Sequence, residues 1–251
     1  MIRFAIRGTV RGRNIVLLFF SLVFYFYGSG LYLVLILAIT LSSFIFGLLI
    51  DTVRNKRLLL TIGIVIPLFL LAVFKYANFF LTEISKLVST IGLPLFHYTS
   101  IILPIGISFY TFQCLSYVID VYQNKAKPER NFIDLFVYIS MFPQLIAGPI
   151  VRYSTIVKQL HERRERLNEF SLGALRFVYG LSKKVMIADA CGQIADAAYQ
   201  IPTDGVSTSV ALLGSLTYCI QIYFDFSAYS DMAIGLGKIF GFKIPENFER
   251  P

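Results

Sequence analysis

The residues best able to do chemistry lie near the end of the chain, in residues 221–231, which read QIYFDFSAYSD. If these residues are helical, their polar side chains form two stripes at four-residue steps, one with Gln221, Asp225 and Tyr229 and the other with Tyr223, Ser227 and Asp231. A carboxylate at the centre of a membrane helix costs roughly 2.5–3.5 kcal/mol on insertion scales, so neither stripe can face lipid. The pattern predicts that protein or a polar passage surrounds this helix. Carboxylates that only fix helix packing are an equally weighted alternative.

Gln144 and Arg152 accompany an apolar segment, residues 132–149, that prolines and glycine interrupt. A full crossing by this segment would place the basic residues after it outside, against the positive-inside rule. A broken or re-entrant segment that returns to the cytoplasmic side removes this conflict. Irregular backbone at membrane depth survives only where protein packs around it or where it lines a wet cavity. We therefore expect residues 142–149 to border an internal polar cavity.

Two charged runs could contact an anionic ligand, residues 162–166 (ERRER) and the pair Lys183 and Lys184. Each run is most simply a solvated face, and each could also attract an anionic headgroup or the phosphates of a cytosolic acyl donor. A helix is expected to begin with Ser171 as its cap and to run towards Tyr199. It should lie obliquely or horizontally and not cross the membrane alone, because the lysine pair interrupts its apolar pattern.

The cysteines and histidines show no spacing typical of a metal site. The three cysteines, Cys114, Cys191 and Cys219, form no Cys-x-x-Cys pair, and His97 and His161 are far apart in the chain. We expect buried free thiols, solvated histidines and no metal site.

The 251 residues are 56% apolar and 15% charged, and the mean hydropathy is +0.69. A soluble domain usually has about a quarter charged residues, and a disordered chain lacks apolar and aromatic residues, so both classes are excluded. The net charge of +8 lies in short runs between apolar blocks, as in cytoplasmic loops of membrane proteins, and not on one solvated face. The lipid bilayer is therefore the expected partner, and nucleic acid is not.

Apolar blocks long enough to be considered as spans lie at residues 31–50, 58–76, 101–122 and 206–224. A shorter block, residues 15–27, resembles the apolar part of a signal peptide, but the bulky Phe26 and Tyr27 at the cleavage position favour a retained anchor as the first span. Residues 80–91 have the pattern of an amphipathic helix that lies in the outer interface or packs under other helices. The basic residues before the first span and those in the loop 51–57 are two crossings apart, so both are expected in the cytoplasm. The sequence predicts an all-α polytopic membrane protein, with broken, re-entrant and interfacial helices around an internal polar cavity. It forms a single transmembrane domain over residues 1–251, with 1–14 as a basic cytoplasmic N-terminus and 15–251 as membrane helices and loops.

A series of motifs, in the same order along the chain, resembles the membrane-bound O-acyltransferase family, in its branch of alginate O-acetylases and teichoic-acid D-alanyl transfer proteins. These motifs include residues 103–113 (LPIGISFYTFQ), 142–144 (FPQ), 148–153 (GPIVRY), 221–231 and 245–248 (PENF). Ala228 stands where the family usually has glycine, which could crowd a close helix contact.

The resemblance implies transfer of an acyl group, commonly acetyl from acetyl-CoA, to cell-envelope polysaccharide such as alginate. It implies acyl-CoA as donor substrate with no bound cofactor, an extracytoplasmic acyl-accepting partner protein or polysaccharide, and a multi-pass location in the bacterial inner membrane. The family's catalytic histidine has no counterpart in these residues. The chain is therefore expected to match the N-terminal portion of such an enzyme and to be inactive alone.

No residue of this chain can be assigned as catalytic. The resemblance and the charge pattern together suggest walls or supports of a tunnel at nine positions: Gln144, Arg152, Lys183, Lys184, Gln221, Asp225, Ser227, Tyr229 and Asp231. Two alternatives stay open at this point. A secondary transporter also uses broken helices and midplane carboxylates, and a catalytically inactive truncated membrane protein would show the same motifs.

Overall fold

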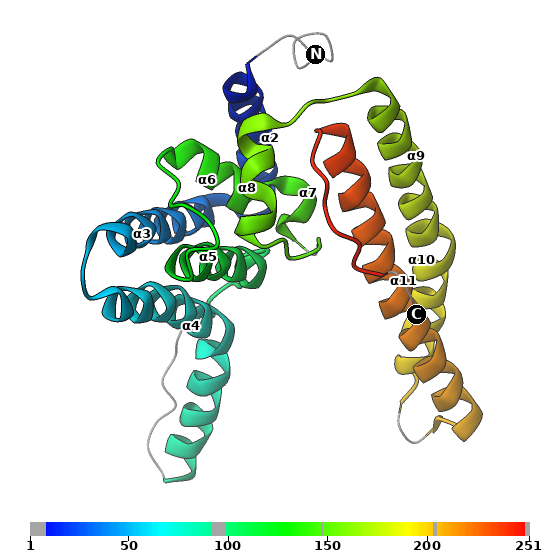
Figure 1. The fold of residues 1–251 in the computed structure, drawn as a ribbon. Coiled ribbons are helices and arrows are strands. Elements are labelled where there is room, and N and C mark those ends of the chain that lie inside the picture. The colour runs from blue at the N-terminus through cyan, green and yellow to red at the C-terminus, as the bar shows by residue number, and fades with distance from the viewer. Residues whose placement is uncertain (1–8, 92–98, 147, 203–204, 249–251) are drawn as a thin grey trace. The chain divides into compact units, whose positions relative to one another are not determined.

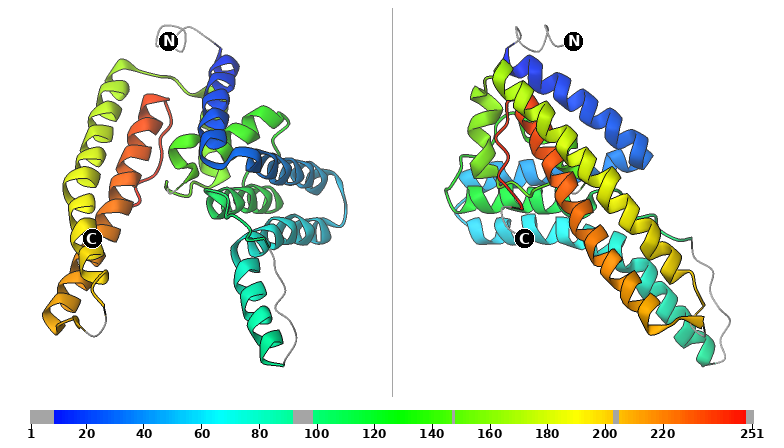
Figure 2. Two further views of the ribbon diagram at one scale, coloured as in Figure 1. Left: turned by 180° about the vertical axis from the view of Figure 1, so that it is seen from behind. Right: turned by 90° about the vertical axis from the view of Figure 1, so that its right-hand side faces the viewer.

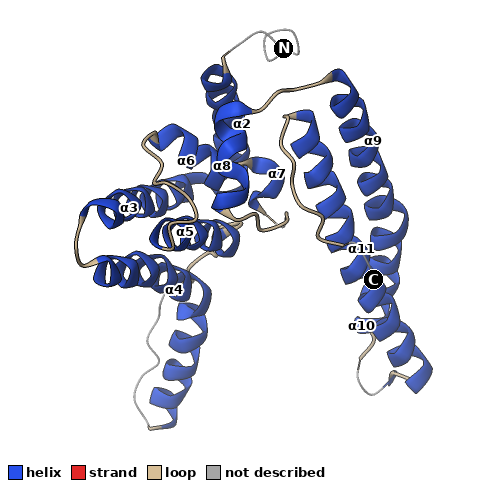
Figure 3. Cartoon of the chain, in the orientation of Figure 1, coloured by secondary structure: helices blue, strands red, loops and turns tan. Residues whose placement is uncertain are grey.

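The structure is a computed structural model that describes residues 9–91, 99–146, 148–202 and 205–248. Helices with short connections make up these ranges, and no strand occurs within them (Figure 3). The all-α prediction is therefore confirmed. The chain divides into an N-terminal unit, Met1–Ile146 with Arg152–His161, and a C-terminal unit, Ala147–Val151 with Glu162–Pro251. The single transmembrane domain remains a prediction.

The N-terminal unit is built around one buried helix. Its elements are α2 (Val10–Ser29), η1 (Gly30–Tyr32), α3 (Leu33–Thr52), α4 (Lys56–Thr90), α5 (Ile107–Tyr122), α6 (Phe132–Ser140), α7 (Phe142–Leu145) and α8 (Tyr153–Glu162). Helix α5 packs against both α3 and α4, while α2 packs against α6 and α7 (Figure 1). Tyr110, Cys114 and Tyr117 of α5 are fully buried, so this helix contributes much of the core.

Among the residues that the structure describes, three helical stretches are long and apolar enough to cross a membrane: Val10–Thr52, Lys56–Thr90 and Thr208–Ile239. The first contains α2 and α3, each of 20 residues, which matches the roughly 20 residues that a span needs. The two helices meet at Gly30, where φ is 55°, a value that favours glycine. The apolar exterior and the spans support a membrane protein.

Helix α4 differs from the sequence expectation. We expected a span that ends near Tyr76 and a separate amphipathic helix over 80–91, but one helix of 35 residues covers both. No proline or glycine lies between Tyr76 and Thr90 to interrupt it, whereas Pro67 lies inside the helix. A helix of this length reaches about 50 Å, more than the roughly 30 Å of the hydrocarbon core.

Two breaks in the N-terminal unit follow from local backbone chemistry. Helix α5 begins only at Ile107, so the predicted start at Ile101 is wrong, because Gly106 before it has φ 72°. The apolar segment 132–149 is broken as predicted, since Met141, with φ −56° and ψ 112°, separates α6 from α7. Pro143 lies in the first turn of α7, where its missing N–H is tolerated.

The C-terminal unit consists of two long antiparallel helical arms. One runs through α9 (Leu167–Lys183), the π-helical segment η2 (Lys184–Ala188) and α10 (Asp189–Tyr199), and the other is α11 (Thr208–Ile239). Figure 2 shows α11 lying along the whole first arm. The predicted cap at Ser171 is wrong: the helix begins at Leu167, and the Ser171 hydroxyl donates back to the Leu167 carbonyl within it.

Small residues allow the backbones of the two arms to touch. A Cβ added to Gly235 would lie 2.7 Å from the Gly173 carbonyl oxygen, and one added to Gly180 would lie 2.7 Å from the Ala228 carbonyl oxygen. Real Cβ atoms do not approach so closely. Glycine at position 180 therefore leaves the space that the Ala228 carbonyl group occupies.

Candidate functional site

Asp231, on α11, is the centre of an ion network that joins the two arms of the C-terminal unit. Its Oδ1 accepts hydrogen bonds from the Arg176 guanidinium at 2.8 and 3.1 Å, and its Oδ2 accepts one from the Lys183 ammonium at 2.7 Å. The Asp231 side chain is only 12% exposed. Two cations thus offset the desolvation of one buried carboxylate.

The same guanidinium also ties down the segment that follows α11. Two nitrogens of Arg176 donate to the two carboxylate oxygens of Glu246, in a bidentate pair. Glu246 belongs to the PENF motif, so the pair connects that motif to α9 and to Asp231.

Asp225, on α11, belongs to a second ion network, which is centred on Lys184 at the start of η2. The Lys184 ammonium lies 2.8 Å from Asp225 Oδ1 and 2.8 Å from Asp189 Oδ1. Hydrogen bonds to Asp189 and then to Asp225 raise the pKa of Lys184 above its ordinary value. The Asp225 side chain is 43% exposed, so this network is more open than that of Asp231.

Three further predicted site residues, Gln221, Ser227 and Tyr229, also lie on α11. Gln221 lies against Gly192 of α10, and its Oε1 is buried with no hydrogen-bond partner in the described part of the chain. Ser227 is buried, and its hydroxyl donates at 3.4 Å to the Phe224 carbonyl. Tyr229 is half-buried.

The two remaining predicted site residues lie in the N-terminal unit. Gln144 is fully buried, and its amide nitrogen donates at 3.0 Å to the Tyr138 carbonyl. Its Oε1 has no partner among the described residues. Arg152 is exposed. The cavity expected beside residues 142–149 remains a prediction.

Residues 55–251 match the sequence profile of the membrane-bound O-acyltransferase family. The chain belongs to this family.

The relatives of this family member are named as O-acetylases and O-acetyltransferases. A probable alginate O-acetylase of Azotobacter vinelandii is 42% identical over 245 residues, and one of Pseudomonas aeruginosa is 41% identical over 245 residues. These alignments cover 96% of this chain and 49% and 47% of the relatives. A peptidoglycan O-acetyltransferase of Helicobacter pylori is 35% identical over 261 residues, with 92% of this chain and 49% of the relative covered. The chain spans about half the length of these relatives.

The structure supplies partners that the sequence of this acyltransferase-family chain did not indicate. It brings Lys183 to Asp231 and Lys184 to Asp225, whereas Arg176, Asp189 and Glu246 were not expected in these networks. The available signal was the resemblance to the family, since Glu246 lies in the PENF motif and Asp189 lies in a further matching stretch, residues 188–189. The contacts of Asp231 fit the packing alternative, and the polar passage remains a prediction.

The charged run 162–166 differs from the simplest interpretation at one residue, Arg163. Arg163 is 5% exposed, its Nε donates at 3.1 Å to the Phe240 carbonyl, and its guanidinium lies over the Phe242 ring. The fully solvated face expected for this run is therefore wrong at Arg163. His161 contacts Glu129 at 3.0 Å, and His97 lies outside the described residues.

The two ion networks are suited to holding helices in place. Their contacts join carboxylates to ammonium or guanidinium groups, which neutralise charge and fix geometry. Acyl transfer needs a base that takes a hydroxyl proton and donors for a developing oxyanion. The contacts of these networks support a positioning role for their members.

Proposed function

We propose that these residues form part of a membrane O-acyltransferase that transfers acetyl from acetyl-CoA to a hydroxyl of cell-envelope polysaccharide such as alginate. The observation that carries this proposal is the 41–42% identity to probable alginate O-acetylases over 96% of the chain. The family match also favours this function over a secondary transporter. The acceptor would be a polysaccharide or an acyl-accepting partner protein on the extracytoplasmic side.

The proposal places the protein in the bacterial inner membrane with its basic N-terminus in the cytoplasm. The basic residues before α2 and those of the loop 51–57 support this orientation, because positive loops stay inside. The donor would reach the protein from the cytoplasm, and the nine tunnel residues named above would be walls or supports.

Residues 1–251 alone are proposed to give no turnover, since the resemblance places the base histidine outside them. The test compares two membrane preparations. One contains this chain alone, and the other contains this chain together with the remaining half of the Azotobacter vinelandii relative. Transfer of radiolabelled acetyl from acetyl-CoA to alginate is measured. The N-terminal half of that relative, paired with the same remaining half, serves as the positive control.

We expect no transfer by the chain alone and measurable transfer when both halves are present. Transfer by the chain alone would show that the base lies within these residues. If the control pair is active and the mixed pair is not, the proposed acetyl transfer to alginate is contradicted.

A further inference from the structure

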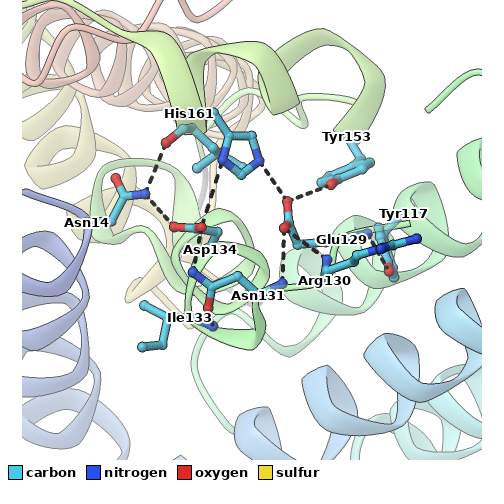
Figure 4. A network of polar contacts seen from close by, with 10 residues as sticks. Asn14, Tyr117, Glu129, Arg130, Asn131, Ile133, Asp134, Tyr153 and His161 are labelled. Atoms are coloured by element: carbon cyan, nitrogen blue, oxygen red, sulfur yellow. Dashed lines mark hydrogen bonds and ion pairs between the residues drawn. The ribbon is translucent and has the colours of Figure 1, made fainter. Parts of the chain in front are cut away.

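A further cluster of charged and polar side chains lies in the N-terminal unit and shares no residue with the two ion networks. Glu129 precedes α6, Asp134 lies in the first turn of α6, and His161 lies in the last turn of α8. One potential ligand atom from each residue lies within 4.8 Å of the others. Figure 4 shows the imidazole of His161 between the two carboxylates.

The two carboxylates are buried and held by neutral donors. The Glu129 and Asp134 side chains are 7% and 5% exposed. Glu129 Oε1 accepts hydrogen bonds from the backbone N–H groups of Arg130 and Asn131 at 3.0 and 3.1 Å. Its Oε2 accepts one from the Tyr153 hydroxyl at 3.1 Å.

Asp134 is oriented by two asparagine side chains. Asn14 of α2 donates to Oδ1 at 2.5 Å, and Asn131 donates to Oδ2 at 2.7 Å. A carboxylate oxygen accepts two hydrogen bonds in its plane, so Asp134 Oδ2 and Glu129 Oε2 each retain one direction towards His161. Hydrogen-bonded carboxylates of this kind are typical of residues that bind a metal ion.

The charge of this cluster is incompletely balanced. Among the described residues, only His161 brings the nitrogens of a basic side chain within 4 Å of either carboxylate. Its Nε2 lies 3.0 Å from Glu129 Oε2, and its Nδ1 lies 3.9 Å from Asp134 Oδ2. A protonated histidine supplies one positive charge against two buried negative charges. Burial of an uncompensated carboxylate costs free energy, so the cluster favours a further cation.

A cavity beside the cluster gives such a cation access. Its volume is about 400 Å³, and Glu129, Asp134 and His161 line it together with Arg11 and Arg130. Both arginines are exposed, and neither guanidinium group forms an ion pair within 4 Å of the two carboxylates. The His161 side chain is 46% exposed, so it can turn from its present hydrogen bond to bind an ion with water molecules as the remaining ligands.

We propose that Glu129, Asp134 and His161 bind one divalent transition-metal ion, with Zn²⁺ as the preferred ion. The 3.0 Å between His161 Nε2 and Glu129 Oε2 fits two neighbouring ligands that each lie about 2.0–2.2 Å from the same ion. An imidazole with carboxylates suits Zn²⁺, whereas Mg²⁺ prefers oxygen ligands and retains its water. The ion would join α8 to the start of α6 and neutralise both carboxylates.

The test uses the full chain, purified in detergent without a histidine tag and treated with a chelator. Zn²⁺ alone, and Mg²⁺ in parallel, are titrated by calorimetry and equilibrium dialysis, and the thermal unfolding temperature is measured with and without Zn²⁺. His161→Gln removes a ligand from a half-exposed position. Glu162→Gln, at the exposed neighbouring position, is the matched control.

We expect one Zn²⁺ per chain, no comparable binding of Mg²⁺, and a higher unfolding temperature with Zn²⁺ in the wild type and in Glu162→Gln. His161→Gln should weaken binding at least about tenfold, because even outer-shell partners of a metal site typically contribute about 10–100-fold. X-ray absorption should show nitrogen and oxygen ligands. No Zn²⁺ binding, equal binding by His161→Gln, or sulfur ligands from the cysteines would each overturn the proposal.

Discussion

The two units of the molecule treat buried carboxylates in opposite ways. In the C-terminal unit, Arg176 and Lys183 surround Asp231, and both carry permanent charge at neutral pH. In the N-terminal unit, neutral donors hold Glu129 and Asp134, and the nearby cation depends on the protonation of His161. The first arrangement is suited to permanent fastening, whereas the second leaves charge that a ligand can neutralise.

The units also differ in how their helices meet. Backbones touch at Gly173 and Gly235 in the C-terminal unit. In the N-terminal unit, large rings fill the core, and Tyr153 packs edge-on against Tyr117 and Tyr138. Substitutions in the two units should therefore destabilise the protein for different physical reasons.

The largest expected effect is at Asp231. Asp231→Asn leaves the largely buried Lys183 without a carboxylate partner and Arg176 with Glu246 alone, so we expect a loss of about 3–5 kcal/mol in the free energy of unfolding. Asp225→Asn is the matched control, because its side chain is 43% exposed, and an exposed pair contributes about 0–1 kcal/mol. Chemical unfolding in mild detergent measures both. Equal losses would contradict the distinction between the two networks.

Gly235→Ala tests the contact between the two arms. The added Cβ would meet the Gly173 carbonyl oxygen and the Phe177 backbone nitrogen, both at 2.7 Å, so the helices must separate. Overpacking of this kind costs about 1–3 kcal/mol. Because backbone atoms block the added Cβ on both sides, we expect a loss of about 3 kcal/mol in the free energy of unfolding. Gly12→Ala, also in a helix, meets its nearest atom at 3.6 Å and should be neutral or slightly stabilising in the same unfolding assay.

Tyr153→Phe tests the neutral donors of the N-terminal unit. The ring packing is retained, but the hydrogen bond to the buried Glu129 is lost. We therefore expect a loss of about 1.5 kcal/mol in the free energy of unfolding. Tyr27→Phe is the control, since Tyr27 is 95% exposed. Unfolding curves that coincide for both variants would show that Glu129 does not depend on this donor.

The smallest expected effect is a dependence on alkaline pH at Lys184. Its raised pKa means that its carboxylate partners stabilise the protonated form in the folded protein. This contribution is complete below the ordinary lysine pKa of 10.5 and is lost as the pH rises through the raised value. The difference in unfolding temperature between the wild type and Asp225→Asn should therefore shrink above pH 10.5. If this temperature difference stayed constant with pH, the ion pair between Lys184 and Asp225 would not be its cause.

The sequence predicted the elements that depend on local chemistry. Apolar length indicated α2, α3 and α11, and proline with its neighbours indicated the break between α6 and α7. Helix α4 was divided wrongly, because an apolar pattern and an amphipathic pattern join without a breaker. The two stripes on α11 were predicted from spacing alone.

The partners of those stripes could not be predicted, because pairing depends on how distant segments meet. Arg176 and Asp231 are 55 positions apart, and the local sequence around Arg176 does not distinguish it as the partner of Asp231. His161 is 32 positions from Glu129 and lies beside a charged run, which favoured a solvated side chain. Only the tertiary arrangement distinguishes these residues from ordinary surface charges.

The π-helical segment Lys184–Ala188 has a consequence for insertions and deletions. Each residue of an α-helix turns the chain by about 100°, so removal of one residue here would rotate α10 by that angle relative to α9. Gly192, which lies against Gln221, would then turn away from α11. The rotation of α10 relative to α9 therefore depends on the number of residues in this segment. Related sequences should conserve that number more strictly than the identities of the residues.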